Sequence, residues 1–201
     1  MSNFNTEFEA RKCVYLNCGQ KVASVYLAFL KRKETTMSRV SILMGSESDW
    51  PVMESCKEVL DELGVPCEVR ITSAHRTPQE TKEYVIDAQN RGCKVFICAA
   101  GMAAHLAGAV AAQTTCPVIG VPISSGALQG VDALLSTVQM PGGIPVATVA
   151  IGKAGAKNAA YLAGQILAVS DEALFQRVLA DREKNKDKVI SQNDALQNSL
   201  S

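Results

Sequence analysis

The residues of this sequence best suited to acid–base chemistry lie in one short segment, Thr72-Ser73-Ala74-His75-Arg76-Thr77-Pro78. An imidazole changes its protonation state near neutral pH, so His75 can pass a proton in either direction. The planar guanidinium of Arg76 suits a phosphate or a carboxylate, and Ser73 adds a hydroxyl. This combination predicts a site that binds an anionic substrate and moves one proton.

A second segment, Gly45-Ser46-Glu47-Ser48-Asp49-Trp50-Pro51, offers hydroxyl groups ahead of a predicted helix. Gly45 permits a tight turn, Ser48 or Asp49 can cap the helix, and Pro51 suits its first turn. Serine hydroxyls and free backbone N–H groups at such a helix start bind phosphate. The same residues would also be expected if they did no more than begin the helix. The segment matches neither the P-loop nor the G-x-G-x-x-G pattern, so it does not favour ATP or NAD chemistry.

A third segment, residues 99–108, consists mostly of alanine and glycine. Side chains this small let a ligand lie directly against backbone amides and make a narrow, dry pocket. His105 is a rival candidate for the proton carrier, although a histidine at a helix start can equally be a structural group. Further along, residues 121–126 and 139–145 are interpreted as pocket wall and subunit contact, with Asp132 as the one acid–base group nearby.

The charge and aromatic content exclude several classes of partner. The 201 residues include 20 Lys+Arg and 20 Asp+Glu, so the formal net charge is zero, whereas a nucleic-acid binder needs a basic surplus. Aromatic residues make up only 5%, which argues against stacking on single-stranded bases. No apolar run approaches the roughly 20 residues that span a bilayer. We therefore expect a small-molecule substrate and no nucleic-acid or membrane partner.

The cysteines and histidines do not have the spacing of a metal site. Seven cysteines occur without a C-x-x-C pair, and only two histidines could add ligands. Several cysteines lie within or beside apolar runs, so they are predicted to be buried, reduced thiols in a reducing cytoplasm. No nucleophile elbow, G-x-S-x-G, is present. The residues alone therefore predict no metal, no nucleotide cofactor and no covalent nucleophile.

These segments must be positioned by regular elements, and the pattern after residue 39 alternates between two kinds. Short β-rich runs cover residues 40–44, 67–71, 94–98, 117–121 and 145–151, and helical patterns cover 50–63, 78–91, 103–113, 130–138, 153–169 and 172–183. This alternation predicts an α/β fold, a three-layer, flavodoxin-like, doubly wound parallel sheet of about five strands with an extra C-terminal helix. The alanine-rich helix at 153–169 is expected to pack against another subunit.

Three regions follow from this pattern. Residues 37–183 are expected to form the main domain, because Met37-Ser38-Arg39-Val40 leads directly into the first strand. Residues 1–36 are interpreted as an N-terminal extension of unassigned role, in which the apolar run at 22–30 is too short to cross a membrane. Residues 184–201 are polar and are expected to form a fraying tail.

Long motifs in this chain resemble the class I N5-carboxyaminoimidazole ribonucleotide mutases of purine biosynthesis. The matching motifs are MGSESDW (44–50), SAHRTP (73–78), GMAAHLAG (101–108) and the stretch from GVPISS to KNAA (120–160), which together cover nearly all of residues 39–183. The related class II enzymes, which carboxylate aminoimidazole ribonucleotide with free carbon dioxide, carry a different first loop without S-D-W. The resemblance therefore favours class I.

The resemblance implies a specific reaction and specific roles. Such enzymes are isomerases that convert N5-carboxyaminoimidazole ribonucleotide to 4-carboxyaminoimidazole ribonucleotide without metal, ATP or biotin, as cytoplasmic homo-octamers. The carboxylate leaves nitrogen as carbon dioxide, stays trapped and is attacked by carbon 4, while His75 serves as the general acid–base. The residues expected to hold the ribose and phosphate are Ser46, Ser48, Asp49, Ser73 and Arg76, and those expected to line the pocket are Ala100, Gly101 and Leu106.

Two residues depart from the family pattern, and two other functions compete with the mutase. Met102 stands where the family usually has glycine, and Ala107 stands where it usually has proline, so we expect an altered rate and not a lost function. The competing functions are the class II carboxylation and a catalytically silent module that binds a sugar phosphate. Dependence on bicarbonate separates the two enzymes, and substitution of His75 separates an enzyme from a silent module.

Overall fold

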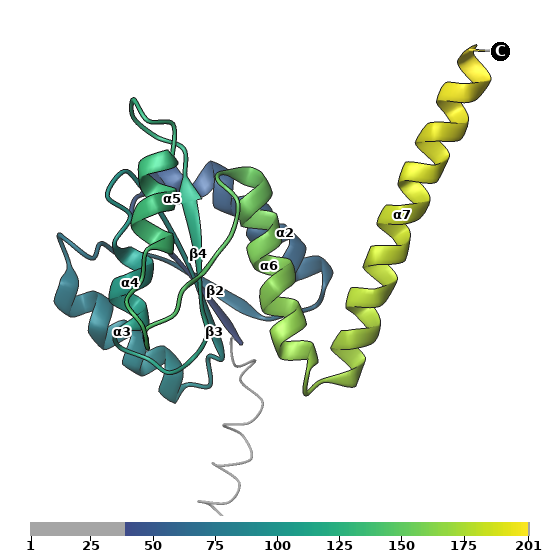
Figure 1. The fold of residues 1–201 in the computed structure, drawn as a ribbon. Helices are drawn as coiled ribbons and strands as arrows, with labels where there is room; N and C mark the ends of the chain where they lie inside the picture. Colours follow the sequence, from purple (N-terminus) through teal and green to yellow (C-terminus); the bar gives the residue numbers. More distant parts are fainter. Residues whose placement is uncertain (1–38, 201) are drawn as a thin grey trace, which may run out of the picture. The chain divides into compact units, whose positions relative to one another are not determined.

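The computed structural model describes residues 39–200, and its centre is a parallel sheet of five strands (Figure 1). The strands are β1 (Val40–Met44), β2 (Cys67–Ile71), β3 (Val95–Gly101), β4 (Val118–Ile123) and β5 (Ala147–Thr148). They lie in the order β2-β1-β3-β4-β5, and every neighbouring pair is parallel. The predicted flavodoxin-like, doubly wound sheet is therefore confirmed. The predicted extension at residues 1–36 lies outside the described residues.

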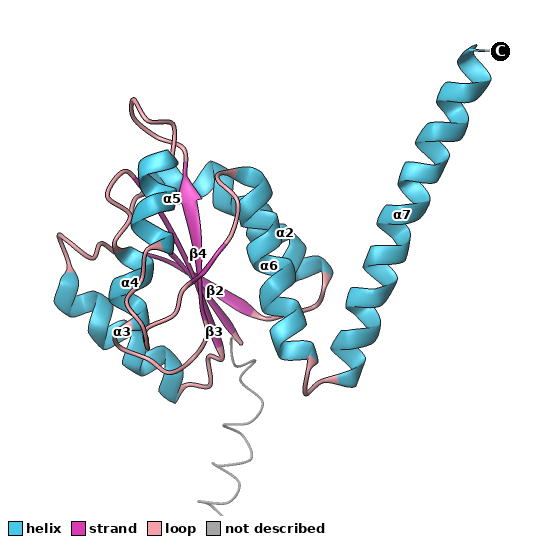
Figure 2. Cartoon of the chain, viewed as in Figure 1, coloured by secondary structure: helices cyan, strands magenta, loops and turns pink. Residues whose placement is uncertain are grey.

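Helices cover both faces of the sheet, which makes three layers (Figure 2). One face carries α2 (Trp50–Glu62) and α6 (Lys153–Ala168), and the other carries α3 (Pro78–Asn90), α4 (Leu106–Ala111) and α5 (Val131–Val138). A short 3-10 turn, η1 (Glu47–Asp49), precedes α2, and α7 (Glu172–Leu200) follows α6. Each helix after β1, β2 and β3 returns the chain to the start of the next strand, as parallel connections require.

The alternation of side chains along β1 explains the two cores. Val40, Ile42 and Met44 join the apolar cluster beneath α2 and α6, whereas Leu43 joins the cluster beneath α3 and α4. Successive residues of a strand point to opposite faces, so a strand buried on both sides must be apolar throughout. The polar residue of this strand, Ser41, is fully buried and is paired with the hydroxyl of Tyr84 on α3.

The alanine-rich helix α6 packs differently from our expectation. Ala156, Ala159, Ala160 and Ala163 are fully buried in the cluster shared with α2, so this face of the helix contacts the protein's own core and not another subunit. Small side chains let α6 lie close to the sheet and to α2, and a β-carbon on Gly164 of the same helix would come within 3.0 Å of Leu63 Cδ1. The small residues serve packing within the chain.

Helix α7 begins as predicted and ends later than predicted. Asp171 caps it by accepting a hydrogen bond from the N–H of Leu174 (3.0 Å), and the same carboxylate binds Arg39 (2.6 Å). The backbone hydrogen bond from Leu174, together with Arg39, lowers the pKa of Asp171. The helix then continues to Leu200 through the segment expected to fray, because no glycine or proline follows Glu172 to end it.

β3 and β5 differ most in length from the predicted runs. β3 extends three residues beyond Cys98, since Ala99, Ala100 and Gly101 pair with β4 although alanine and glycine favour strands weakly. β5 is regular over only two residues, because Pro145 has no N–H for a sheet hydrogen bond and only Ala147 and Thr148 align with β4. The longer β3 carries its last two residues to the edge where the site lies.

The described cysteines are all free thiols, as predicted. Cys56, Cys93 and Cys98 are buried, and Cys67 and Cys116 are half-buried. Burial is the main cause that raises the pKa of Cys56 and of Cys93 to about 12, so these thiols stay protonated at neutral pH. The two remaining cysteines, Cys13 and Cys18, lie outside the described residues. Within residues 39–200, no helix has the length and apolar character needed to cross a bilayer.

The contact between β4 and α5 generates a prediction about stability. A β-carbon on Gly120 would lie 2.2 Å from Thr137 Cγ2 and 3.0 Å from Val146 Cγ1, whereas one on Gly142 would meet nothing within 4 Å. Gly120→Ala should therefore lower the free energy of unfolding by about 1–3 kcal/mol, because α5 must move away from β4. Gly142→Ala is the matched control and should change it by less than about 0.5 kcal/mol.

Thermal and urea-induced unfolding of both variants would measure this difference. Equal stability of the Gly120→Ala variant and the unchanged protein would contradict the close packing of α5 on β4.

Candidate active site

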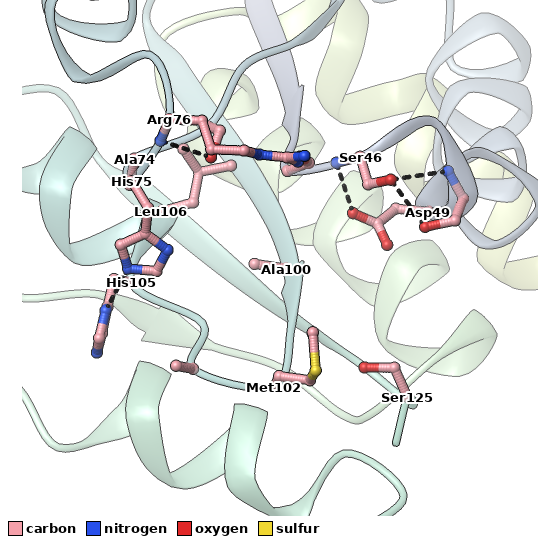
Figure 3. A pocket seen from close by; sticks show the side chains of 15 residues that line it. Ser46, Asp49, Ala74, His75, Arg76, Ala100, Met102, His105, Leu106 and Ser125 are labelled. Carbon is pink, nitrogen blue, oxygen red and sulfur yellow. Dashed lines mark hydrogen bonds between the residues drawn. The ribbon is translucent and has the colours of Figure 1, made fainter.

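The loops after β1, β2, β3 and β4 meet at one edge of the sheet, because parallel strands end on the same side. There they enclose a pocket of about 430 Å³ at the place where the strand order reverses around β1 (Figure 3). Open α/β sheets bind ligands at such a reversal. The pocket brings together all nine residues singled out from the sequence: Ser46, Ser48, Asp49, Ser73, His75, Arg76, Ala100, Gly101 and Leu106.

The loop after β1 is folded tightly by its own side chains. The N–H of Ser46 donates to Asp49 Oδ2 (3.1 Å), and Ser46 Oγ accepts from the N–H (3.3 Å) and the hydroxyl (2.9 Å) of Ser48. This reciprocal pairing is a capping box, which satisfies the free N–H groups of the turn. Asp49 is buried, and burial raises the pKa of its carboxyl, while backbone hydrogen bonds from Ser46 and Gly45 oppose that shift.

The loop after β2 places a positive charge against the first loop. Ser73 and Thr77 hold this loop in shape, since the N–H of Ser73 donates to Thr77 Oγ1 (2.9 Å) and Thr77 Oγ1 donates to the carbonyl of Ser73 (3.1 Å). The N–H of Arg76 donates to Ser73 Oγ (3.2 Å), and its Nη2 donates to the carbonyl of Gly45 (3.2 Å). The guanidinium therefore lies beside the serines of the first loop, as Figure 3 shows for Ser46.

Both histidines of the chain lie at this pocket, in direct contact. His75 Nε2 and His105 Nδ1 are 2.7 Å apart, and the two rings meet edge to face with centroids 4.9 Å apart. The sequence left open whether His105 is a second proton carrier or a structural group at a helix start. In the structure, His105 is the residue that immediately precedes α4, and its side chain contacts His75. Both histidines are exposed at the pocket rim.

The loops after β3 and β4 supply a wall of small residues and one unpaired hydroxyl. Ser125 Oγ is buried and has no hydrogen-bond partner within residues 39–200, although it belongs to the pocket lining. It lies so close to Gly101 that a β-carbon there would come within 2.2 Å of the hydroxyl. A buried hydroxyl without a partner costs free energy, so this group is suited to bind a polar ligand atom.

Six further residues line the pocket beyond the nine expected to bind the substrate or act on it: Gly45, Ala74, Met102, Ala103, His105 and Ser125. The sequence indicates Ser125 only as pocket wall, and its place just after the end of β4 is the available signal for a closer role. Asp132 is not among the lining residues, and its carboxylate accepts from the N–H of Ala133 (2.9 Å) at the start of α5.

The geometry divides the pocket into chemically distinct parts. Two serine hydroxyls and a guanidinium, from Ser46, Ser48 and Arg76, can hold a phosphate. The paired imidazoles of His75 and His105 can donate and accept protons at the opposite part of the rim (Figure 3). Between them, the short side chains of Ala100 and Gly101 leave room for a flat ligand.

Comparison with known proteins identifies a family that matches this chain. A model of the AIR carboxylase family matches residues 39–188. The chain is 55% identical to the N5-carboxyaminoimidazole ribonucleotide mutase of Bacillus subtilis, covering 78% of this chain and 97% of that protein. It is 52% identical to the mutase of Escherichia coli K12, covering 78% of this chain and 93% of that one.

Solved structures agree with the sequence relatives. The crystal structure of Treponema denticola PurE superimposes with a TM-score of 0.71 at 32% identity, covering 78% of this chain and 97% of that chain. A second Treponema denticola structure, PurE2-S38D, superimposes with a TM-score of 0.72 at 31% identity, covering 78% and 96%. On the match over residues 39–188 and on these identities, the chain belongs to the AIR carboxylase family.

Proposed function

We propose that this protein is an N5-carboxyaminoimidazole ribonucleotide mutase, an isomerase that forms 4-carboxyaminoimidazole ribonucleotide in purine biosynthesis. The relatives that are 50–55% identical over most of the chain carry this name. The observation in the structure that supports it best is that two groups of side chains meet at one pocket at the strand reversal. They are the phosphate cradle, which consists of Ser46, Ser48 and Arg76, and the histidine pair. The class II carboxylation is not favoured, because these relatives are named mutases.

In the proposed complex, the ribose phosphate lies against the first two loops. The phosphate accepts hydrogen bonds from the hydroxyls of Ser46 and Ser48 and from the guanidinium of Arg76, whose positive charge matches it. Asp49 and Ser73 contact the ribose hydroxyls. The imidazole ring then reaches the wall formed by Ala100, Gly101 and Leu106, and a polar group of the substrate pairs with Ser125 Oγ, the unpartnered hydroxyl of that wall.

The reaction needs only one recycling proton, and His75 carries it in this proposal. The bond between the exocyclic nitrogen and the carboxylate breaks, carbon dioxide departs, and the nitrogen receives a proton from His75. Carbon 4 then attacks the trapped carbon dioxide, and His75 takes the proton that carbon 4 loses. The histidine ends in its starting state, so neither a second substrate nor a net proton is required.

The trapped carbon dioxide must remain in the pocket between the two steps. The small residues of the β3 loop leave a narrow space beside the ring, and exclusion of water from it slows escape and hydrolysis. Leu106 is buried and closes this space from the α4 side. The expected balance is therefore a polar end that anchors the nucleotide and a dry end that retains carbon dioxide.

The two departures from the family pattern have different structural settings. Met102 has a φ of 50°, a left-handed conformation that suits glycine, and its side chain is 61% exposed on the pocket lining. Ala107 lies on α4, is 2% exposed and packs in the apolar core that this helix covers. We infer that Met102 carries backbone strain and crowds the pocket, while Ala107 changes only the packing of the helix.

We also propose that the protein works as a cytoplasmic homo-octamer. Helix α5 and the turn before it expose an apolar stripe, and a second copy of the chain is the occupant that the resemblance implies. Its members are Leu128, Val131, Leu135 and Val138, each at least 47% exposed. The spacing of three and four residues places them on one side of the helix, opposite the buried Ala133 and Thr137. The free thiols among the described residues are compatible with a reducing compartment.

The central experiment mixes the purified protein with freshly prepared N5-carboxyaminoimidazole ribonucleotide, without ATP or bicarbonate. We expect conversion to the 4-carboxy isomer, measured by its ultraviolet absorbance, well above the uncatalysed rate. His75→Asn should abolish turnover and keep ligand affinity, measured by calorimetry, within about tenfold, since the phosphate cradle is intact. Conversion that requires bicarbonate would indicate a class II carboxylase, and binding without conversion would indicate a silent module.

Met102→Gly should raise the free energy of unfolding by about 0.5–1 kcal/mol, because relief of the left-handed strain exceeds the entropy that glycine adds to the unfolded chain. Met102→Ala is the control: it removes the long side chain, keeps the β-carbon, and should bring no such gain. Thermal unfolding measures both. Equal stabilisation by the two substitutions would show that side-chain crowding, and not the backbone, is the cost at this position.

Light scattering after gel filtration should give a mass about eight times the 21.4 kDa of the chain. Leu135→Glu should reduce this mass, since it places a charge in the middle of the apolar stripe. Ile86→Glu is a matched control on α3, where Ile86 is 44% exposed one helical turn after Lys82 and Glu83, and it should leave the mass unchanged. A monomeric unchanged protein would refute the octamer.

A further inference from the structure

We propose that Thr72, Thr77 and Thr81 are positioning residues that hold the loop of residues 73–76 in the geometry that the reaction needs. The inference rests on the proposed function, in which this loop carries the proton carrier and the guanidinium of the phosphate cradle. We call the three residues the threonine cluster. None of them is among the residues that line the pocket, so they act on the substrate only through the loop.

The central contact of the threonine cluster joins the end of β2 to α3. Thr72 directly follows β2, and its Oγ1 lies 2.6 Å from Thr81 Oγ1 on α3, with the two residues only 5% and 3% exposed. Thr81 Oγ1 donates to the carbonyl of Thr77 (2.8 Å). A hydroxyl has one proton to donate, so Thr81 accepts the proton of Thr72. The hydrogen bonds therefore run in one direction, from Thr72 through Thr81 to the backbone of Thr77.

Thr77 closes the loop from its other end. It is the N-cap residue of α3, where a threonine hydroxyl usually accepts a hydrogen bond from the first N–H groups of the helix, but its side chain makes no such bond. Its Oγ1 instead accepts from the N–H of Ser73 (2.9 Å) and donates to the carbonyl of Ser73 (3.1 Å). The hydroxyl that could cap α3 is thus used on the loop.

The threonine cluster also fixes this loop relative to the loop after β1. The N–H of Thr72 donates to the carbonyl of Met44 (2.8 Å), the last residue of β1, and Arg76 Nη2 donates to the carbonyl of the next residue, Gly45 (3.2 Å). The first contact is buried and the second is exposed. Thr72 therefore connects the end of β1 to α3, and the reach of Arg76 depends on that connection.

A shift of the loop would move two functional groups at once. Figure 3 shows that they leave the loop in different directions, with Arg76 directed toward Ser46 and His75 directed toward His105. No single rotamer change could restore both directions after such a shift. The loop must therefore be held at both of its ends, as the hydroxyls of Thr72 and Thr77 hold it.

The stability of the fold does not account for these hydroxyls. A threonine inside a helix, such as Thr81, is weakly favoured, and its bond to the carbonyl four residues earlier does not strengthen the helix. Thr77 leaves α3 without a side-chain cap. A buried pair of hydroxyls can be replaced by apolar groups of the same shape at little cost in free energy. Residues that break local preferences beside a site are expected where position matters.

The double variant Thr72→Val with Thr81→Val tests the threonine cluster. Valine has the shape of threonine, and removal of both hydroxyls leaves neither without a partner, so the midpoint of thermal unfolding should stay within about 2 °C. The value of kcat/KM should fall about 10- to 100-fold, because a small misplacement of reacting groups is costly. Both kcat and KM should change, since the proton carrier and the guanidinium share the loop. Unaltered kcat/KM would overturn the proposal.

Thr137→Val is the matched control. Thr137 is 3% exposed on α5, its Oγ1 donates to the carbonyl of Ala133 (2.7 Å), and it does not line the pocket, so kcat/KM should equal that of the unchanged protein. A loss as large as that of the double variant would overturn the assignment, since any buried hydroxyl would then serve. If the double variant does not fold, Thr81→Ser and Thr81→Ala are compared. The serine should keep kcat/KM within about threefold and the alanine should lose about tenfold, and equal values would overturn the proposal.

Hydrogen exchange of the backbone, measured by NMR, tests the threonine cluster without turnover. The N–H groups of Ser73 and Arg76 should exchange about tenfold faster in the double variant, because the loop opens more often, while that of Ile97 in the middle of β3 should not change. Unchanged exchange at Ser73 and Arg76 would overturn the proposal. Failure of the unchanged protein to convert N5-carboxyaminoimidazole ribonucleotide would refute the proposed function, and faster exchange in the double variant would still support the hold on the loop.

Discussion

The reversal of strand order around β1 is the constraint on which the rest of the site depends. β1 pairs with β2 on one side and with β3 on the other. The loop after β1 leads to α2 on one face of the sheet, whereas the loops after β2 and β3 lead to α3 and α4 on the other face, and a gap is left between them. Every strand is parallel, and all these loops therefore lie at the same edge. Residues as distant in sequence as Ser46 and Ser125 line one pocket for this reason.

Side chains that connect one loop to another turn this gap into a defined site. Arg76 reaches from the β2 loop to the carbonyl of Gly45 after β1, and His75 reaches from the same loop to His105 after β3. The β2 loop thus contacts both of its neighbours through adjacent residues. Exposed contacts of this kind add little to the free energy of folding. Their importance is geometric, because they hold a cation and an imidazole at fixed places around one ligand.

Small residues also shape the site and the core, because they leave space for neighbouring elements and side chains. Gly120 lets α5 approach β4, Gly101 leaves room for the hydroxyl of Ser125, and the buried alanines of α6 bring that helix onto the sheet. A packed interior tolerates neither voids nor overlap, so the absence of a side chain is as specific as its presence. Met102 and Gln129 are exceptions at this edge, since each has a β-carbon and occupies a left-handed conformation.

The sequence by itself determined the fold class and singled out nine of the residues that line the pocket. Alternating strand and helix patterns are local properties, and the loop positions of His75, Arg76 and Ser46 followed from them. The end of β3, the length of α7 and the burial of the α6 alanines did not follow, because pairing partners and packing surfaces lie far away in the chain. Only the tertiary structure decided that His105 contacts His75 and that Ser125 Oγ is buried without a partner. Both are relations between side chains from separate loops, and no local spacing encodes a distance across the pocket.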